Sequence, residues 1–536
     1  MVLDNNKYTK EFKINAEDLN KSVKSIENLV AQYLLAFSEK QDPNKIFKVC
    51  MGNPELKELF VKNIKISQEL CTDITEYMNN LSPEQVKQNY TVETKEKEKR
   101  EKKLEYPKME ITGEVVTAYP PDPSKYPHIG HAYASYINYH FAKMHDGKFI
   151  IRFEDTNPTI IKKEYYDAIL SGLKWAGIIP DKVVNASDYI EQLYDEARKF
   201  IQNGQVYVCD CFAGTVKLNR QTKKECGCRK KTVEKNLEEF ADLIKGKYEP
   251  GKKSVRLKLD MKDKRAEMRD PVIMRIIVDT HPLQGDKYKL WPSYVWQNTF
   301  LDHYNGVTHR FRSKEFEPWK PVQEKVAELA GFKMPYIYEY ARVNISGVKA
   351  SGREIRELVE KGEMSWDDPR LTTLVALKKR GFIPNAIINF IEKMGLSKTE
   401  ATAQWTVLES MNRKELVDVE KVACFDEVKE FEVNGEKIYL NTENLKENTE
   451  YRLRHFCNVI YKKEKFEVCG NEIKKGLSIL PFAKAVKEIT IINQEGNKIK
   501  ALIEDKELKE TNYFFEGYGF VKIDSLKPLV AYFAHK

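Results

Sequence analysis

The chain has 536 residues, 41% of them hydrophobic and 32% charged, so it is too long for one hydrophobic core and several domains are expected. This composition, without any run of about 18 apolar residues and without the apolar core of a signal peptide at the start, excludes disordered and membrane-spanning classes and predicts a cytoplasmic protein with no membrane partner. The net charge of +8, from 89 basic and 81 acidic residues, is compatible with a polyanionic partner but does not require one.

The first part of the chain, residues 1 to about 90, is predicted to be helical. Val23, Ile26 and Val30 recur at three- and four-residue steps, which is the spacing of one helix face. The run KEKEKREKK at 95–103 has no apolar residue and predicts a solvated helix or linker rather than an RNA-binding arm. We therefore end this region at residue 105. It contains no motif with visible chemistry, and a protein-docking module and a structural role are both open.

The next stretch, 117–131, reads TAYPPDPSKYPHIGH and lies between a β-type run at 114–117 and a predicted helix. A strand, a tight loop and a helix start form a phosphate-binding arrangement, because the first backbone N–H groups of a helix are unpaired and its dipole is positive there. Gly130 allows close approach, and His128 and His131 can each donate a hydrogen bond to a phosphate oxygen. Taken alone, the His-x-x-His pair is equally typical of a surface or metal pair.

A second strand is predicted at 149–153, after the turn at Asp146 and Gly147, and it runs into the loop EDTNP at 154–158. Strand, helix and strand make a βαβ unit, which predicts a parallel sheet with ligands at the carboxyl ends of its strands. The two loops, 117–131 and 154–158, should therefore meet at that edge.

Four of the nine cysteines fall in two close pairs separated by a polar spacer of fourteen residues, and these are Cys209, Cys211, Cys226 and Cys228. Four thiolates can close a tetrahedral zinc site, and because all four positions are then filled by protein the metal would be structural. Four reduced surface thiols are the alternative, which we consider less favoured. Further on, the stretch 256–302 is expected to form a buried hydrophobic sheet, and from about residue 426 short alternating runs with turns such as Asn434-Gly435 predict β-barrels.

Several motifs of this sequence resemble those of one protein family, and they occur in the same order as in that family. HIGH at 128–131 resembles the first signature of class I aminoacyl-tRNA synthetases, and PPDPS at 120–124 resembles the glutamyl and glutaminyl branch. The later words are RFEDTNP at 152–158, WPSYVWQNTFLDHYNGVTHRFRSKEF at 291–316, YEYARVNISGVKASGREI at 338–355 and SWDDPRLTTLVALKKRGFIPNAIINFI at 365–391. With a barrel-type C-terminal region, the resemblance is to archaeal-type glutamyl-tRNA synthetases over about residues 105 to 536.

The resemblance implies a multidomain fold. It places a helical extension at 1–105 and an α/β Rossmann-like catalytic domain at 106–345, with an acceptor-end and zinc insertion near 205–270. A loop similar to the family's KMSKS signature and a helical stem-contact region follow at 346–425, and a β-barrel anticodon-binding domain at 426–536 completes the chain.

The resemblance also implies a ligase that uses ATP with Mg²⁺ to join glutamate to tRNA(Glu), through glutamyl-adenylate, with release of AMP and pyrophosphate. It assigns ATP to Pro120, His128, Gly130, His131 and Lys349, and catalysis to His128, His131, Lys349, Ser351 and Arg353. The amino acid is assigned to Glu154, Tyr294, Asn298 and Arg312, with Glu154 on its ammonium group. Arg312 favours glutamate, because a guanidinium pairs a γ-carboxylate with two hydrogen bonds.

Two positions depart from the family. The family word TRFPPEPSG has an arginine, which helps bind the substrate carboxylate, where this chain has Ala118, and the second signature has a lysine where this chain has Gly352. Arg310 stands where the family usually has a small or apolar residue, and on a strand it shares a face with Arg312. We hypothesise that Arg310 replaces the missing charge and so belongs to the amino-acid site.

Alternative functions remain open. A glutaminyl-tRNA synthetase, or a synthetase for another small amino acid, is permitted by Ala118 and opposed by Arg312. A non-catalytic tRNA-binding paralogue would explain Ala118 and Gly352, but both histidines and Glu154 are retained. A relative that glutamylates a tRNA base usually lacks the anticodon domain, so the predicted barrels count against it. Whether tRNA(Gln) is a second substrate is also open.

Overall fold

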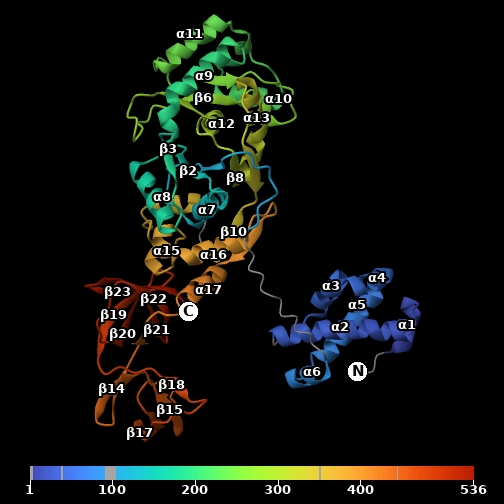
Figure 1. The fold of residues 1–536 in the computed structure, drawn as a ribbon, viewed down its shortest axis with the longest axis vertical. Helices are drawn as coiled ribbons and strands as arrows, with labels where there is room; N and C mark the ends of the chain where they lie inside the picture. The colour runs from blue at the N-terminus through green and yellow to red at the C-terminus, as the bar shows by residue number, and fades with distance from the viewer. Residues whose placement is uncertain (1–3, 38–39, 91–103, 349–351, 444) are drawn as a thin grey trace. The chain divides into compact units, whose positions relative to one another are not determined.

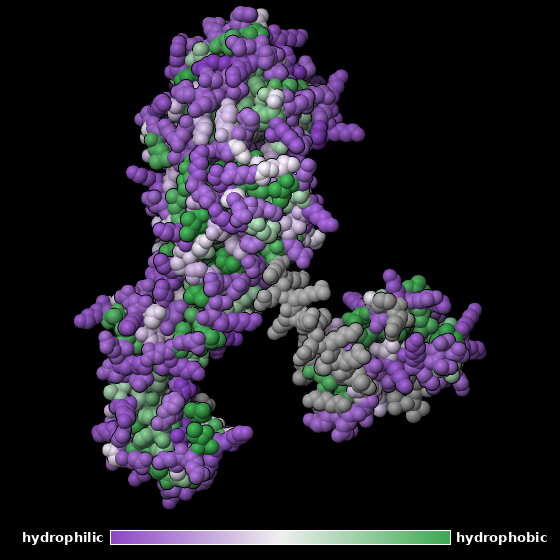
Figure 2. Space-filling model, viewed as in Figure 1, coloured by the Kyte–Doolittle hydropathy of each residue, from purple (hydrophilic) through white to green (hydrophobic). Residues whose placement is uncertain are grey.

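The computed structural model describes residues 4–37, 40–90, 104–348, 352–443 and 445–536. The chain divides into two compact units, Met1–Glu101 and Lys102–Lys536 (Figure 1). Among the described residues, no helix is long and apolar enough to cross a membrane. Hydrophilic side chains cover most of the face of the second unit that Figure 2 shows.

The first unit is a bundle of helices around its own apolar core, as predicted. The helices are α1 (Asn5–Phe12), α2 (Ala16–Phe37), α3 (Pro43–Gly52), α4 (Pro54–Lys62), α5 (Ile64–Met78) and α6 (Pro83–Asn89). Ile26 and Val30 of α2 are buried in the core, together with Ile74 of α5. The helical periodicity in the sequence therefore marks the faces that pack together.

The second unit begins with a parallel sheet. Its strands are β1 (Val116–Tyr119), β2 (Lys148–Phe153), β3 (Lys182–Asn185), β8 (His309–Ser313) and β9 (Tyr336–Tyr340), in the order β3-β2-β1-β8-β9, and all pairs are parallel. Helices α7 (Ile129–Met144) and α8 (Lys163–Trp175) connect the first three strands (Figure 1). The strand order reverses between β1 and β8, which is where a doubly wound sheet binds its ligands. The predicted βαβ unit is confirmed.

A long insertion separates β3 from β8 and carries an antiparallel sheet of order β4-β5-β6-β7. Its elements are η1 (Ala186–Tyr189), α9 (Ile190–Gln202), β4 (Val206–Cys209), α10 (Ala213–Thr222), η2 (Gly227–Lys230), α11 (Val233–Ile244), β5 (Ser254–Leu257), η3 (Ala266–Met268), β6 (Val272–Ile276), β7 (Leu290–Pro292) and α12 (Tyr294–Tyr304). The expectation of a buried sheet throughout 256–302 is wrong for its last part, because the chain becomes helical at Tyr294. Residues 295–302 are all buried, with polar side chains among them, so α12 has no solvent-exposed face there to reveal its period.

After β8 come η4 (Lys314–Trp319) and α13 (Lys320–Ala330), and after β9 a mainly helical region. It contains β10 (Val343–Ser346), α14 (Gly352–Glu360), α15 (Leu374–Arg380), α16 (Pro384–Met394), β11 (Ala401–Gln404) and α17 (Trp405–Glu415), with β10 and β11 paired in parallel. Helix α15 ends at Gly381, whose φ of 93° is the left-handed conformation of a helix C-cap. The basic end of α15 reaches the last strand of the chain, because Arg380 Nη2 donates to the carbonyl of Ala534 at 2.6 Å.

The C-terminal region is built of β-strands, as predicted. β12 (Lys421–Phe425), β19 (Val486–Ile492), β20 (Lys498–Glu504), β21 (Asn512–Glu516), β22 (Gly519–Leu526) and β23 (Leu529–His535) form a closed barrel in the order β12-β20-β19-β23-β22-β21. β15 (Thr449–Leu453), β16 (Asn458–Lys462), β17 (Lys465–Gly470) and β18 (Ser478–Leu480) form a second sheet, and β13 (Lys429–Val433) and β14 (Glu436–Leu440) form a hairpin. The hairpin turns at Asn434 and Gly435, which both have positive φ.

Candidate active site

The loop between β1 and α7 presents two imidazoles at the start of a helix. His128 is the N-cap of α7, and its Nδ1 accepts a hydrogen bond from the Gly130 N–H at 3.0 Å. Nδ1 of His131 in turn accepts from the His128 N–H at 3.2 Å. Because both Nδ1 atoms are acceptors, each neutral ring carries its proton on Nε2.

Both rings are held in the neutral form. Burial, followed by electrostatic repulsion from His131, if it were protonated, and from Lys125, holds the pKa of His128 well below its usual 6.5. Burial and the charge of Lys125 lower the pKa of His131 to about 3. The loop can therefore donate two N–H groups to an anion without becoming protonated.

The loop between β1 and α7 is held in place by contacts with a segment more than 230 residues away in the sequence. The Ile129 N–H donates to the carbonyl of Thr372 at 3.1 Å, and the Leu374 N–H donates to that of Pro127 at 2.8 Å. Tyr126 also stacks on Trp366, with ring centroids 4.9 Å apart. The resemblance implies a role in contacting the tRNA stem for the motif at 365–374. In the structure this motif also positions the candidate phosphate loop.

Part of the predicted second signature lies outside the described residues, namely Lys349 and Ser351. Arg353 is described, on α14, where its side chain is 84% exposed and pairs with Glu357 at 3.0 Å. Gly352 lies directly against the first signature, because a Cβ placed on it would be 2.7 Å from His128 Nε2. The described end of the second signature thus contacts the first.

On the other side of the sheet, strands β1, β2 and β8 present a common face. The register pairs Ala118 with Ile150 and Thr117 with His309, so Ala118 is the neighbour of Arg310 on the face opposite to α7. Arg152 lies on this face two residues beyond Ile150, and Glu154 follows at the carboxyl end of β2.

These strands and α12 build a buried network of charges. Glu154 accepts hydrogen bonds from Arg152 Nε at 3.1 Å, Gln297 Nε2 at 2.5 Å and Asn298 Nδ2 at 3.1 Å. Asp302 accepts from Nη1 of Arg152 and from Nη1 of Arg310, both at 2.8 Å. Burial raises the pKa of Glu154, against the opposing effect of the two guanidinium groups.

Two guanidinium nitrogens in this network lack an acceptor. Arg152 Nη2 and Arg310 Nε are both buried and have no hydrogen-bond partner within the described part of the chain. A buried donor left unpaired is costly and is rare in folded proteins, and a guanidinium fits a carboxylate well. The network therefore has unused donors of the kind that bind an acidic ligand.

Arg312 lies at the far end of the same network. Its Nη2 pairs with Glu339 at 2.7 Å and its Nη1 donates to Gln323 at 2.7 Å, and Gln323 in turn donates to Asn298 at 3.1 Å. Tyr294 packs against Phe316 near this end, with ring centroids 5.0 Å apart, and burial raises its pKa.

The structure thus brings Glu154, Asn298 and Arg310 into one network and links Arg312 to it through Gln323. The members of the network that the sequence analysis did not single out are Arg152, Gln297, Asp302, Gln323 and Glu339. The signal for Arg152 was present, since it stands two residues before Glu154 on one strand. The partners from α12, α13 and β9 carried no such signal, because they meet only in the folded chain.

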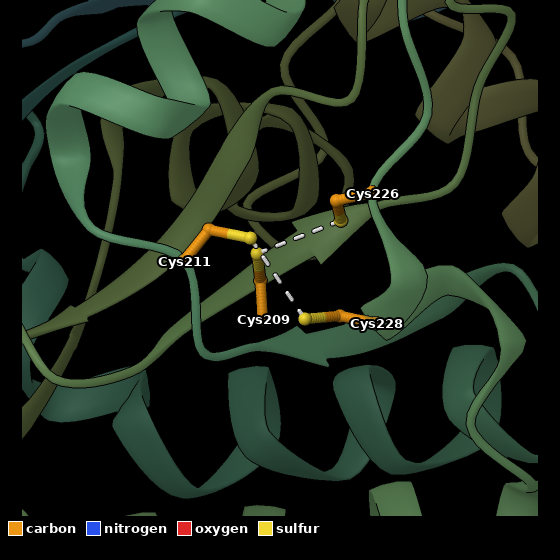
Figure 3. A group of neighbouring side chains, drawn as sticks. All are labelled: Cys209, Cys211, Cys226 and Cys228. Atoms are coloured by element: carbon orange, nitrogen blue, oxygen red, sulfur yellow. Dashed lines mark hydrogen bonds between the residues drawn. The ribbon is translucent and has the colours of Figure 1, made fainter.

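The four predicted cysteines converge in the insertion. Their sulfur atoms all lie within 4.8 Å of one another and point toward a common centre (Figure 3). Sγ of Cys209 and Cys226 are 3.9 Å apart, and those of Cys211 and Cys228 are 4.0 Å apart. Four sulfurs at the usual zinc distance of about 2.3 Å from a shared ion would be separated by roughly 3.8 Å, so the cluster has the size of a tetrahedral zinc site.

The surroundings of the cluster suit bound thiolates. The buried Arg256 donates from Nη1 to Cys209 Sγ at 3.6 Å, and the Asp210 N–H donates to Cys228 Sγ at 3.4 Å. Such N–H groups offset the negative charge of thiolates on a metal ion. The close grouping of the four sulfur atoms argues against the alternative of four unrelated surface thiols.

The fold and the site agree with comparisons to known proteins. A family model described as "tRNA synthetases class I (E and Q), catalytic domain" matches residues 114–418. Glutamate–tRNA ligase of Nitrosopumilus maritimus is 40% identical over 397 residues, which cover 72% of this chain and 68% of that protein. The glutamate–tRNA ligases of Sulfurisphaera tokodaii and Pyrococcus furiosus are each 33% identical, covering 94% and 95% of this chain and 95% and 100% of theirs. The chain therefore belongs to the class I tRNA synthetases of the glutamate and glutamine subclass.

Proposed function

We propose that this protein is a glutamate–tRNA ligase. The observation that carries the proposal is the end-to-end similarity to archaeal proteins of that name, at 33% identity over 94% of this chain in one case. In the reaction, the α-carboxylate of glutamate attacks the α-phosphorus of ATP and pyrophosphate leaves. The terminal adenosine hydroxyl of tRNA then takes the glutamyl group and AMP leaves. Both nucleophiles come from substrates, so the protein contributes positioning and charge.

We assign ATP to the loop from Pro120 to His131. His128 and His131 donate from Nε2 to the phosphates, and Gly130 at the start of α7 leaves room for them. Lys349, Ser351 and Arg353 serve the departing pyrophosphate, as the resemblance implies. Magnesium bound with ATP would neutralise phosphate charge.

We assign glutamate to the buried charge network. Glu154 holds the ammonium group of the substrate. The unpaired nitrogens of Arg152 and Arg310 support a role for Arg310 at a carboxylate, which is the charge that Ala118 does not provide. Arg312 binds the γ-carboxylate of the substrate together with Tyr294 and Asn298. Its guanidinium then donates hydrogen bonds to both the substrate and Glu339.

A single experiment tests the activity and its rivals. Purified full-length protein is incubated with tRNA, ATP and radioactive glutamate or glutamine, and the charged tRNA is counted. Charging with glutamate that is lost in a Glu154→Gln variant supports the proposal. Charging with glutamine alone, or binding of tRNA without charging, would contradict it. Separate tRNA(Glu) and tRNA(Gln) transcripts determine whether the second is also a substrate.

We propose that the cysteine cluster holds one structural zinc ion. Cys209, Cys211, Cys226 and Cys228 supply all four ligands, so the ion would fix the insertion rather than take part in the reaction. Elemental analysis should find about one zinc per chain in the wild type. A Cys226→Ser/Cys228→Ser variant should lose the metal, and equal zinc content in both proteins would contradict the assignment.

The remaining assignments are coarser. We propose that the protein acts in the cytoplasm, and that the α1–α6 bundle is a docking module for another protein. The support for docking is that the bundle has its own core and contains no catalytic motif. Wild-type charging activity in a chain that starts at residue 104 would agree with it, and loss of glutamate activation would contradict it.

A further inference from the structure

Lys125 occupies an unusual place in the candidate phosphate loop. It precedes His128 by three residues, and its side chain is only 20% exposed although it carries a flexible amino group. Its partner is Asp122, but the distance from Nζ to Oδ1 is 3.5 Å, which is long for a strong ion pair. Within the described residues, this mostly buried ammonium has one distant acceptor, so it has N–H groups available for a ligand.

The side chain of Lys125 lies close to Gly352. A Cβ placed on Gly352 would lie 2.9 Å from Lys125 Cε and 2.7 Å from His128 Nε2. Both distances are too short for real atoms, so the absence of a side chain at 352 is what allows the lysine stem and the imidazole to meet there. The ammonium of Lys125 therefore lies beside the histidine that donates to phosphate, and its charge lowers the pKa of both histidines.

The sequence at these two positions shows a reciprocal exchange. The family word TRFPPEPSG ends in glycine where this chain has Lys125, and the second signature has a lysine where this chain has Gly352. A Cβ on residue 352 would lie 2.9 Å from Lys125 Cε, so a lysine at either position would occupy the region beside His128.

We propose that Lys125 binds the phosphate chain of ATP in this protein, in the space that Gly352 leaves open. The inference rests on the proposed function, but it concerns ATP binding alone. Lys125, with the Nε2 groups of His128 and His131, forms a three-donor cradle for phosphate at the start of α7. Lys125 thereby adds a cationic group in the first signature loop to those that Lys349 and Arg353 supply from the second.

The test is calorimetric binding of Mg-ATP and of adenosine to the full-length protein, without glutamate or tRNA. Lys125→Met removes the charge and keeps the stem, and it should weaken ATP binding roughly ten- to a hundredfold while leaving adenosine binding unchanged. Lys125→Arg should keep most of the ATP affinity. Lys148→Met is the matched control. Lys148 is the first residue of β2, its side chain is 60% exposed, and the variant should bind both ligands normally.

Two results would overturn the proposal. One is ATP affinity in Lys125→Met within twofold of the wild type, and the other is an equal loss for adenosine, which would indicate a merely structural role. Wild-type protein that binds ATP but does not charge tRNA with glutamate would refute the proposed function and leave this inference standing.

Discussion

Replacing Arg310 by methionine tests whether Arg310 supplies the substrate-binding positive charge that the family has at the position of Ala118. The side chain is buried, and among the described residues the printed acceptors, on Asp302 and Asn298, all bond its Nη1. Its Nε has no partner among the described residues, so it is free for a carboxylate. A charge-assisted hydrogen bond is worth roughly 1.5–3 kcal/mol, so KM for glutamate in ATP–pyrophosphate exchange, with tRNA present, should rise about ten- to a hundredfold. KM for ATP should stay unchanged.

The same substitution affects stability, which has to be separated from binding. Removing one partner of a buried ion pair costs about 3–5 kcal/mol in general, although Asp302 keeps Arg152 at 2.8 Å and should limit the loss. Thermal unfolding of each variant sets the temperature at which kinetics are measured. Arg269→Met is a suitable control, because within the described part of the chain that buried guanidinium bonds backbone carbonyls of the insertion alone. It should lower Tm without changing KM for glutamate.

An unchanged KM for glutamate in folded Arg310→Met would refute this reasoning. A second result would also count against it. Ala118 and Arg310 are neighbours on one face of the sheet, so Ala118→Arg/Arg310→Val returns the charge to the position that the family uses. This double variant should bind glutamate better than Arg310→Val alone. Equal KM values in the two would show that the positions do not substitute for each other.

Three further predictions concern the other sites. Gly352→Ala places a Cβ 2.7 Å from His128 Nε2, and the overpacking should weaken ATP binding about tenfold or more by calorimetry; normal affinity would show that α14 moves away freely. His131 has its pKa lowered from 6.5 to about 3, so its stabilising effect is complete above pH 6.5 and declines as the pH falls. Urea unfolding measures the free energy of unfolding of wild type and of His131→Gln. The excess of the wild type should be smaller at pH 5.0 than at pH 7.5, by up to about 2 kcal/mol, and an equal excess at both pH values would contradict a neutral buried ring. Arg256→Met should release zinc to a chelator about ten- to a hundredfold more readily than wild type if the contact with Cys209 steadies the thiolate, whereas equal release would assign Arg256 to packing alone.

The sequence was informative where local pattern determines structure. The βαβ unit, the turn at Asn434-Gly435 and the four cysteines each follow from residues close together in the chain, and the structure contains all of them. It was misleading for α12, where burial on all sides hides the helical period. It was silent on the partners of Arg312 and on the contact of Gly352 with Lys125, because these depend on segments that are distant in sequence.

Helix α15 joins two parts of the protein that are expected to hold different substrates. At its first residue, the Leu374 N–H bonds the carbonyl of Pro127 in the phosphate loop, and at its last residue, Arg380 bonds the carbonyls of Phe533 and Ala534 in β23 of the barrel. A helix of seven residues is about 10 Å long and does not stretch, so it acts as a short rigid strut. A displacement of the barrel would therefore move the candidate phosphate loop as well. If one ligand binds at the barrel and another at this loop, their binding free energies are linked through α15, and the coupling is equal in both directions.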